Sequence, residues 1–330
     1  MGKTALFWPS KNPVLSIPIT LALGFTAGLF VDTSSLGNFI LICTFLMIYP
    51  TMIGVKLKEA FDFSHAKVVG ISLIINFLLI PLLAWGLGTT FLSGDPSMMA
   101  GLAIAGLLPT SGMTISWTMM FKGNVPAAIK MTALSLIIGS ILAPFYLLIM
   151  VGKYVPIDLM KTFTTIAVIV FLPLVLGHVT FLQLKKKYSQ EHFQKVIKPY
   201  LPAVSFWAML AIIFASISMK SKMVLARPDL LGGILLALAV FYLINFTLST
   251  VIARLFLNRA DGVALIYGTV MRNLSIALGL AITAFGPQAA LVVTLAFILQ
   301  VQAAAWYGKM ADRFGFFGKT PSDSLAVKQA

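Results

Sequence analysis

The sequence predicts an all-α polytopic membrane protein with ten transmembrane helices in two inverted repeats of five. Three observations support this fold class. Hydrophobic residues make up 59% of the 330 residues and charged residues only 10%, whereas a soluble domain has about 25% charged residues. The apolar residues come in blocks of about 20, which is the length that spans a bilayer core. The two blocks with the most irregular sequences occupy matching places in the two halves, which predicts discontinuous helices 4 and 9.

Ten apolar blocks follow one another along the chain. Each is expected to be helical, because only intrahelical hydrogen bonds satisfy the backbone of such a segment within lipid. The expected spans are residues 14–31, 36–55, 67–93, 98–121, 125–151, 160–181, 200–219, 230–256, 262–285 and 288–309. The hydrophilic stretch 183–200 is expected to be the loop between spans six and seven.

The positive charges predict the orientation of these spans. With ten spans, 18 of the 24 lysine and arginine residues fall on the side of both termini. The other side has five: Lys153, Lys161, Lys220, Lys222 and Arg227. Cytoplasmic loops are enriched in positive charge, so we expect a multi-pass protein of the cytoplasmic (plasma) membrane with both termini cytoplasmic. The net charge of +14 is then explained by residues that orient the spans and contact the lipid headgroups of the bilayer, and no nucleic-acid partner is expected.

The spans divide into a first repeat (1–151), a second repeat (152–310) and a cytoplasmic tail (311–330). An internal echo supports this division, since Ile-Asn-Phe occurs in the third span of each half, with Asn76 in one and Asn245 in the other. An odd number of spans per half makes the second half enter from the opposite side. Inverted repeats of this kind are common in secondary transporters.

The fourth span of each half contains an interruption. Residues 106–117 read GLLPTSGMTISW, and residues 266–279 read IYGTVMRNLSIALG. Interrupted spans at corresponding positions point to a binding site near the bilayer midplane of a secondary transporter. The alternative is a simple kink at Pro109, because proline and glycine are common in membrane helices.

Arg272 is the one charged residue that we place deep in a span. All ten carboxylates fall in loops, tails or span ends, so Arg272 has no obvious intramembrane counter-ion, and such a charge is costly there. One hypothesis is that an anionic substrate supplies the missing charge. The alternatives are that Arg272 lies at a shallower depth, or that it pairs with helix C-terminal carbonyls or with Asp261.

Oxygen-bearing side chains surround the two breaks. The candidate substrate-binding residues are Asn76, Pro109, Thr110, Ser111, Thr114, Asn245, Arg272, Asn273 and Ser275. The candidate ion-binding residues are Thr114, Thr132, Thr269, Met271, Asn273 and Gln300. Any single hydroxyl can instead bond back to its own helix, whereas a buried amide such as Asn76 or Asn245 must find partners on another segment.

The sequence gives little support for enzyme chemistry. His178 has no carboxylate partner within the membrane, and the single cysteine, Cys43, excludes an internal disulfide and any multi-cysteine metal site. We therefore expect no enzyme, no cofactor and no metal centre. Na⁺ stays open as a coupling ion.

Three stretches resemble a known family. They are Phe45–Ala60 (FLMIYPTMIGVKLKEA), Phe121–Ser135 (FKGNVPAAIKMTALS) and Met271–Gly286 (MRNLSIALGLAITAFG). They resemble the bile acid:sodium symporter superfamily and, within it, the arsenite-permease (arsenical resistance) branch, over about residues 14–310. The resemblance implies a core of spans 3–5 and 8–10 that moves against a panel of spans 1, 2, 6 and 7. It also implies that spans four and nine unwind and cross at the site.

The chain departs from the arsenite-permease pattern at two positions. Where those permeases have a cysteine in span four, this chain has Pro109-Thr110. Their glutamate in span nine corresponds to Ser275. The missing thiol counts against trivalent arsenic as a substrate.

The sodium-symporter pattern is also incomplete. Its Ser/Thr-Asn pair in span four corresponds to Thr114-Ile115, and its glutamate in span nine falls near Gly268. Its Gln-Asn pair becomes Arg272-Asn273. The lost glutamate and the added Arg272 both disfavour a bound cation, so Arg272 is a candidate built-in cation, with transport driven by the substrate gradient or by protons.

Thr132 matches a sodium-ligand position implied by the resemblance. We expect a secondary transporter that moves a small organic anion by alternating access, with sodium coupling left open. The alternative is an arsenite or oxyanion efflux permease, and a more distant alternative is a non-transporting membrane sensor. The sequence leaves the oligomeric state open.

Overall fold

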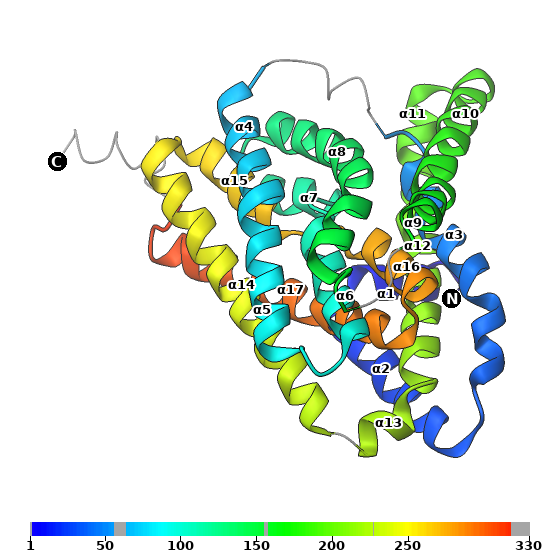
Figure 1. Cartoon of the computed structure of the whole chain (residues 1–330). Helices are drawn as coiled ribbons and strands as arrows, with labels where there is room; N and C mark the ends of the chain where they lie inside the picture. Colours follow the sequence, from blue (N-terminus) through cyan, green and yellow to red (C-terminus); the bar gives the residue numbers. More distant parts are fainter. Residues whose placement is uncertain (1, 56–63, 155–157, 227, 318–330) are drawn as a thin grey trace, which may run out of the picture.

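The computed structural model describes residues 2–55, 64–154, 158–226 and 228–317, and these residues form helices and no β-strand (Figure 1). Within this part of the chain, eight helices or helix runs are long and apolar enough to cross a membrane, and two bent helix pairs raise the number of candidate spans to ten. The predicted all-α membrane fold is confirmed. The inverted relation between its halves stays a prediction.

Seven candidate spans run without a break. They are η1 (Ser34–Phe39) with α3 (Ile40–Met52); α4 (Ala66–Ile74) with η3 (Ile75–Leu79) and α5 (Ile80–Phe91); α8 (Val125–Val151); α9 (Leu159–Ile166) with η4 (Ala167–Phe171) and α10 (Leu172–Lys187); α11 (Gln190–His192) with η5 (Phe193–Ile197) and α12 (Tyr200–Ser218); α14 (Pro228–Phe256); and α17 (Pro287–Arg313).

The other three candidate spans have a bend or an interruption. They are α1 (Gly2–Lys11) with α2 (Pro13–Phe30), α6 (Pro96–Leu107) with α7 (Gly112–Met120), and α15 (Arg259–Val270) with α16 (Leu274–Ala284). The axes of α6 and α7 differ by 54°. Spans four and nine are therefore discontinuous as expected. A short helix, α13 (Ser221–Ala226), follows α12.

Three boundaries differ from the expected ones. The expected loop 183–200 is largely helical, because α10 continues to Lys187 and α11 with η5 fills most of the remainder. Three lysines end α10, where the negative end of the helix dipole stabilises positive charge. Helix α1 was not expected, since it is too short and polar to stand out as a span. Helix α17 extends to Arg313, beyond the expected tail boundary, and the tail residues 318–330 lie outside the described residues.

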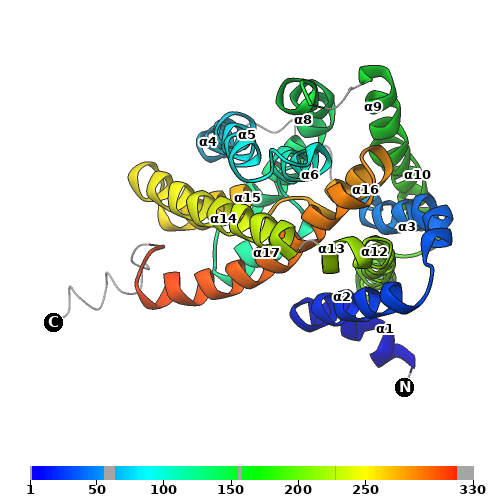
Figure 2. The same ribbon diagram turned by 60° about the horizontal axis from the view of Figure 1, so that its bottom comes forward.

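The helices gather into two groups around the broken spans. In one group α12 packs against α1, α2 and α3, and α3 packs against α10. In the other, α5, α6, α8, α14, α15 and α17 make contacts with one another. Figure 2 shows α1, α2, α3 and α12 on one side and α4, α5, α8 and α14 on the other. Whether the two groups move as core and panel stays a prediction.

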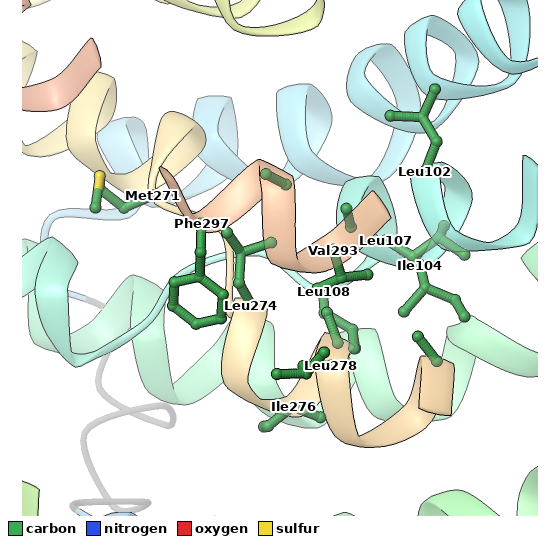
Figure 3. Packing of buried hydrophobic residues seen from close by; sticks show 14 of the residues in the cluster. Leu102, Ile104, Leu107, Leu108, Met271, Leu274, Ile276, Leu278, Val293 and Phe297 are labelled. Atoms are coloured by element: carbon green, nitrogen blue, oxygen red, sulfur yellow. The ribbon is translucent and has the colours of Figure 1, made fainter. Parts of the chain in front are cut away.

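Span nine lies at the centre of the molecule. About 89% of its most apolar stretch is buried, against 28% for the span that contains α3. Apolar side chains pack on both sides of the breaks, and Figure 3 shows Leu107 and Leu108 near Leu274, with Val293 and Phe297 of α17 beside them. The buried polar groups at the breaks thus lie among apolar side chains, where each one needs a hydrogen-bond partner.

Candidate functional site

The break in span four is formed by residues 108–111, the four residues between α6 and α7. Pro109 has no N–H to continue a helix, and Thr110 has a left-handed backbone with φ +56°, which is costly for a β-branched residue. Ser111 then begins α7, since its hydroxyl accepts from the Met113 N–H at 3.2 Å. The Ser111 N–H donates back to Thr114 Oγ1 at 3.3 Å, which completes a capping box.

The break in span nine meets the break in span four. Helix α15 ends at Val270, and the side chain of Asn273 caps α16 by accepting from the Ile276 N–H at 3.3 Å. The Asn273 N–H donates to the Leu108 carbonyl at 2.7 Å. Helix α6 packs against α16, and α7 packs against α15. We call the region around the Leu108–Asn273 hydrogen bond the crossing.

Arg272 lies at the crossing and has no exposed surface. Its guanidinium donates to the carbonyl oxygens of Ala105 at 3.3 Å, of Thr269 at 3.1 Å and of Gly106. It also donates to Asn76 Oδ1 at 2.5 Å. The carbonyls belong to the C-terminal turns of α6 and α15, where the helix leaves its last carbonyls without backbone partners. Arg272 therefore binds the ends of both broken helices at once.

This geometry identifies the hydrogen-bond partners of Arg272 within the protein. The guanidinium is inside the protein rather than near its surface, and its partners are helix C-terminal carbonyls. Asp261 is not a partner, because it accepts hydrogen bonds from Asn124 and Asn258 instead. A direct ion pair between Arg272 and a substrate is thus not needed to satisfy the side chain.

The two Ile-Asn-Phe asparagines converge on the end of α15. Asn76, in the π-helical turn η3, donates to the Gly268 carbonyl at 3.0 Å and to Ser72 Oγ at 3.1 Å. Asn245 of α14 donates to the Thr269 carbonyl at 3.1 Å. Both amides thus find partners on another span, and they satisfy adjacent carbonyls that the break in span nine leaves free.

Gln300 of α17 fixes the backbone of the break itself. Its Oε1 accepts from the Arg272 N–H at 2.8 Å, and its Nε2 donates to the Arg272 carbonyl at 3.3 Å. The Tyr242 hydroxyl donates to the same Oε1 at 3.2 Å. Thr114 adds a bond between the broken spans by donating to the Tyr267 carbonyl at 3.3 Å.

Thr132 bonds back to its own helix, as Thr269 does. The Thr132 hydroxyl donates to the Ala128 carbonyl at 2.8 Å, which is the bond expected of an isolated threonine in a membrane helix. Met271 is buried at the end of α15, and Ser275 is half-buried in the first turn of α16. Roles in binding remain open for all of these residues.

Sequence reasoning missed Tyr242 and Ser72. Tyr242 lies three residues before Asn245 on α14, and Ser72 lies four residues before Asn76. Both spacings place the polar pair on one helix face. A stripe of polar side chains at helical spacing, rather than single polar residues, was the signal that would have found them.

Two hollows in the described part of the chain lie away from the crossing. One, of about 570 Å³, is lined by Leu41, Asp158, Met160, Thr164, Thr165, Val168, Ile169 and Thr283, and so lies between α3, α9 and α16. The other, of about 310 Å³, includes Asp32, Lys220 and Lys222 in its lining. The Ser34 backbone N–H, which donates to Asp32 at 3.0 Å, holds the pKa of that carboxyl below its usual value.

A polytopic helical bundle whose interrupted spans cross at a buried polar site is the construction of a secondary transporter. The model of the Sodium Bile acid symporter family matches residues 41–227, more than half of the chain, and the chain belongs to this family of transporters. The expected family is thereby confirmed.

Three relatives are similar to most of the chain. Protein YbaS of Bacillus subtilis, described as uncharacterized, is 27% identical over 252 residues, covering 76% of this chain and 81% of YbaS. The arsenical-resistance protein Acr3 of Corynebacterium glutamicum is 22% identical over 303 residues, covering 83% and 81%. The uncharacterized transporter slr0944 of Synechocystis is 23% identical over 231 residues, covering 63% and 59%.

Proposed function

We propose that this chain is a secondary transporter that moves a small organic anion by alternating access, with the crossing as its binding site. The observation that supports an anion is the charge of the crossing. Four half-helix ends meet there, and each carries roughly half an elementary charge. The negative ends of α6 and α15 cancel the positive ends of α7 and α16, so the Arg272 guanidinium leaves the crossing with about +1.

The groups available to an anion lie at the two helix N-termini. Ser111 is half-buried and Gly112 is exposed in the first turn of α7, while Ser275 is half-buried in the first turn of α16. Among the described residues, the Ser275 hydroxyl makes no hydrogen bond. Free N–H groups and hydroxyls at helix N-termini are suited to carboxylates and phosphates. By contrast, Asn76 and Asn245 already hold the backbone together.

A screen of anions tests this proposal. The detergent-purified protein would be unfolded by heat with mono- and dicarboxylates and with neutral amides of the same shape, at constant ionic strength. A ligand that binds only the folded state raises its melting temperature. We expect carboxylates to do so and the neutral analogues not to. Stabilisation by the neutral analogues alone would contradict an anion site.

Hydroxyl variants locate the bound anion. Ser111→Ala and Ser275→Ala should each weaken binding of the best carboxylate by roughly 3- to 10-fold, the value of one lost hydrogen bond. Ser116→Ala is the matched control, because Ser116 lies on α7 but donates to the Gly112 carbonyl of its own helix. Equal affinity in all three variants would place the anion elsewhere.

Efflux of arsenite or another oxyanion is the second candidate. The similarity to the arsenical-resistance protein Acr3 over most of both chains supports it. Expression in arsenic-sensitive bacteria, with growth measured in arsenite and in arsenate, tests it directly. Resistance without any stabilisation by carboxylates would favour this candidate over the first.

We also propose that the chain lies in the cytoplasmic membrane with both termini cytoplasmic, on the positive-inside argument. Reporter fusions after the first and ninth spans, compared with fusions after the second and tenth, should show opposite locations. Equal activity of a periplasm-specific reporter at all four positions would contradict this topology.

A further inference from the structure

The oxygen atoms around the Arg272 guanidinium resemble the ligand set of a monovalent cation. Four acceptors surround it, from three segments: the carbonyls of Ala105 and Gly106 on α6, the carbonyl of Thr269 on α15, and Asn76 Oδ1 in η3. Each of these oxygens is neutral. Carbonyl oxygens at unwound positions and at half-helix C-termini are the groups that bind Na⁺ and similar ions within membrane proteins.

The charge around the guanidinium matches one monovalent cation. A buried arginine ordinarily pairs with a carboxylate, whereas the partners of the Arg272 side chain among the described residues are carbonyl and amide oxygens. The C-terminal ends of α6 and α15 supply roughly half a negative charge each. Of the four helix ends, the guanidinium contacts only these two negative ones, so one positive charge is favoured at this point and a second cation beside Arg272 would be repelled, while the crossing as a whole keeps about +1.

The oxygen cage is held by bonds that do not involve the guanidinium. Gln300 clamps the backbone of Arg272, and the Tyr242 hydroxyl orients Gln300. Asn245 donates to the Thr269 carbonyl, which is itself one of the cage oxygens, and Thr114 donates to the Tyr267 carbonyl of the same helix end. Shortening the Arg272 side chain should therefore leave a cavity lined by oxygens rather than a collapsed helix end.

We propose that the crossing is a monovalent-cation site that Arg272 permanently fills with its own guanidinium. The wild-type chain then has no use for external Na⁺ at this position. Removal of the guanidinium turns the crossing into a site that binds a free cation. This inference concerns the cation and not the transported solute, so it can fail while the anion proposal stands, and the reverse also holds.

Thermal unfolding of Arg272→Ala and Arg272→Gln tests the inference. Each purified full-length variant would be heated in choline, sodium and guanidinium chloride, at low-millimolar guanidinium and equal ionic strength. Choline serves as the reference because it is too large for the cage. We expect both variants to melt below the wild type in choline and to recover by at least about 3 °C, saturably, in sodium or guanidinium.

Three comparisons make the result decisive. The wild type and Arg272→Lys should melt at the same temperature in sodium and choline, because a tethered cation fills the cage in both. Arg254→Ala is the matched control, since Arg254 also donates to backbone carbonyls, those of Gly315 and Phe316, but at an exposed position. It should show no preference among the cations.

Two results would overturn the inference. One is the same melting temperature in all three salts for both Arg272→Ala and Arg272→Gln. The other is a sodium-specific stabilisation of the wild type that persists in Arg272→Lys. If Arg272→Ala does not fold, Arg272→Gln alone decides, because its neutral side chain keeps part of the methylene stem while removing the guanidinium.

Discussion

Asn76→Asp would change the charge of the crossing while keeping the size of the side chain. Asn76 Oδ1 already accepts from Arg272 Nη1 at 2.5 Å, so a carboxylate there would pair with the guanidinium. The substitution removes the donor that now binds the Gly268 carbonyl at 3.0 Å. The net charge of the crossing falls from about +1 to about 0.

The two consequences have different sizes. Losing the bond to Gly268 lowers the stability of the fold by about 1–3 kcal/mol. A close charge pair raises it by up to about 4 kcal/mol before the desolvation cost of the pair is subtracted. Stability should therefore change by no more than about 3 kcal/mol in either direction. For an anion roughly 8 Å away, one unit charge at an effective dielectric constant of about 20 is worth about 2 kcal/mol, or roughly 30-fold in affinity.

The assay is a titration with the best carboxylate from the anion screen, in which binding is measured by thermal unfolding or by calorimetry. Asn76→Asp should remain folded and should bind the carboxylate roughly 30-fold more weakly. Asn245→Asp provides the contrast, because Asn245 contacts the Thr269 carbonyl and not the guanidinium, so its carboxylate should destabilise the fold. Unchanged affinity in a folded Asn76→Asp protein would refute the reasoning from net charge.

Three further predictions concern other parts of the molecule. A Cβ at Gly279 would lie 2.7 Å from Thr44 Cγ2 between α16 and α3, so Gly279→Val should block movement of α16 along α3 and stop uptake into proteoliposomes. Gly86→Ala is the control and should keep uptake, because a Cβ there meets nothing within 4 Å. Normal uptake by the valine variant would argue against movement of α16 along α3. Thr110→Gly should raise the melting temperature, because the left-handed backbone of Thr110 costs about 1–3 kcal/mol for a non-glycine residue. A lower melting temperature would show that the contacts of the Thr110 side chain stabilise the fold by more than this strain costs. Cys43→Ser should leave any arsenite resistance intact, since Cys43 is on α3 rather than at the crossing; loss of resistance in growth assays would implicate the thiol.

The positions of the spans and of the two interruptions could be predicted because both depend on local sequence. An apolar block of about 20 residues has one stable form in lipid. Proline followed by hydroxyl residues at 109–111 and the polar segment at 271–273 mark places where a helix must end. The two interruptions and the two asparagines, Asn76 and Asn245, were therefore visible from residue types and spacing alone.

The partners of Arg272 could not be predicted in the same way. The sequence offered no nearby carboxylate, and that absence left an anionic substrate, helix C-terminal carbonyls and Asp261 as open alternatives. The partners are the Ala105, Gly106 and Thr269 carbonyls. Backbone carbonyls belong to every residue, so they become specific ligands only where two helices end at the same point in space. Residue types do not encode that coincidence, and only the fold reveals it.

The same charge count predicts the direction in which a membrane potential would drive transport. An empty crossing has about +1, and one loaded with a monovalent anion is about neutral, so the potential acts on the empty state. Each elementary charge gains about 2.3 kcal/mol per 100 mV across the full membrane. An inside-negative potential should draw the empty site toward the cytoplasm, where it would load, and so favour export. In proteoliposomes with a potassium diffusion potential, reversing the sign of the potential should reverse which direction of anion movement is faster. Rates that ignore the potential would mean that the binding site does not move its charge through the field.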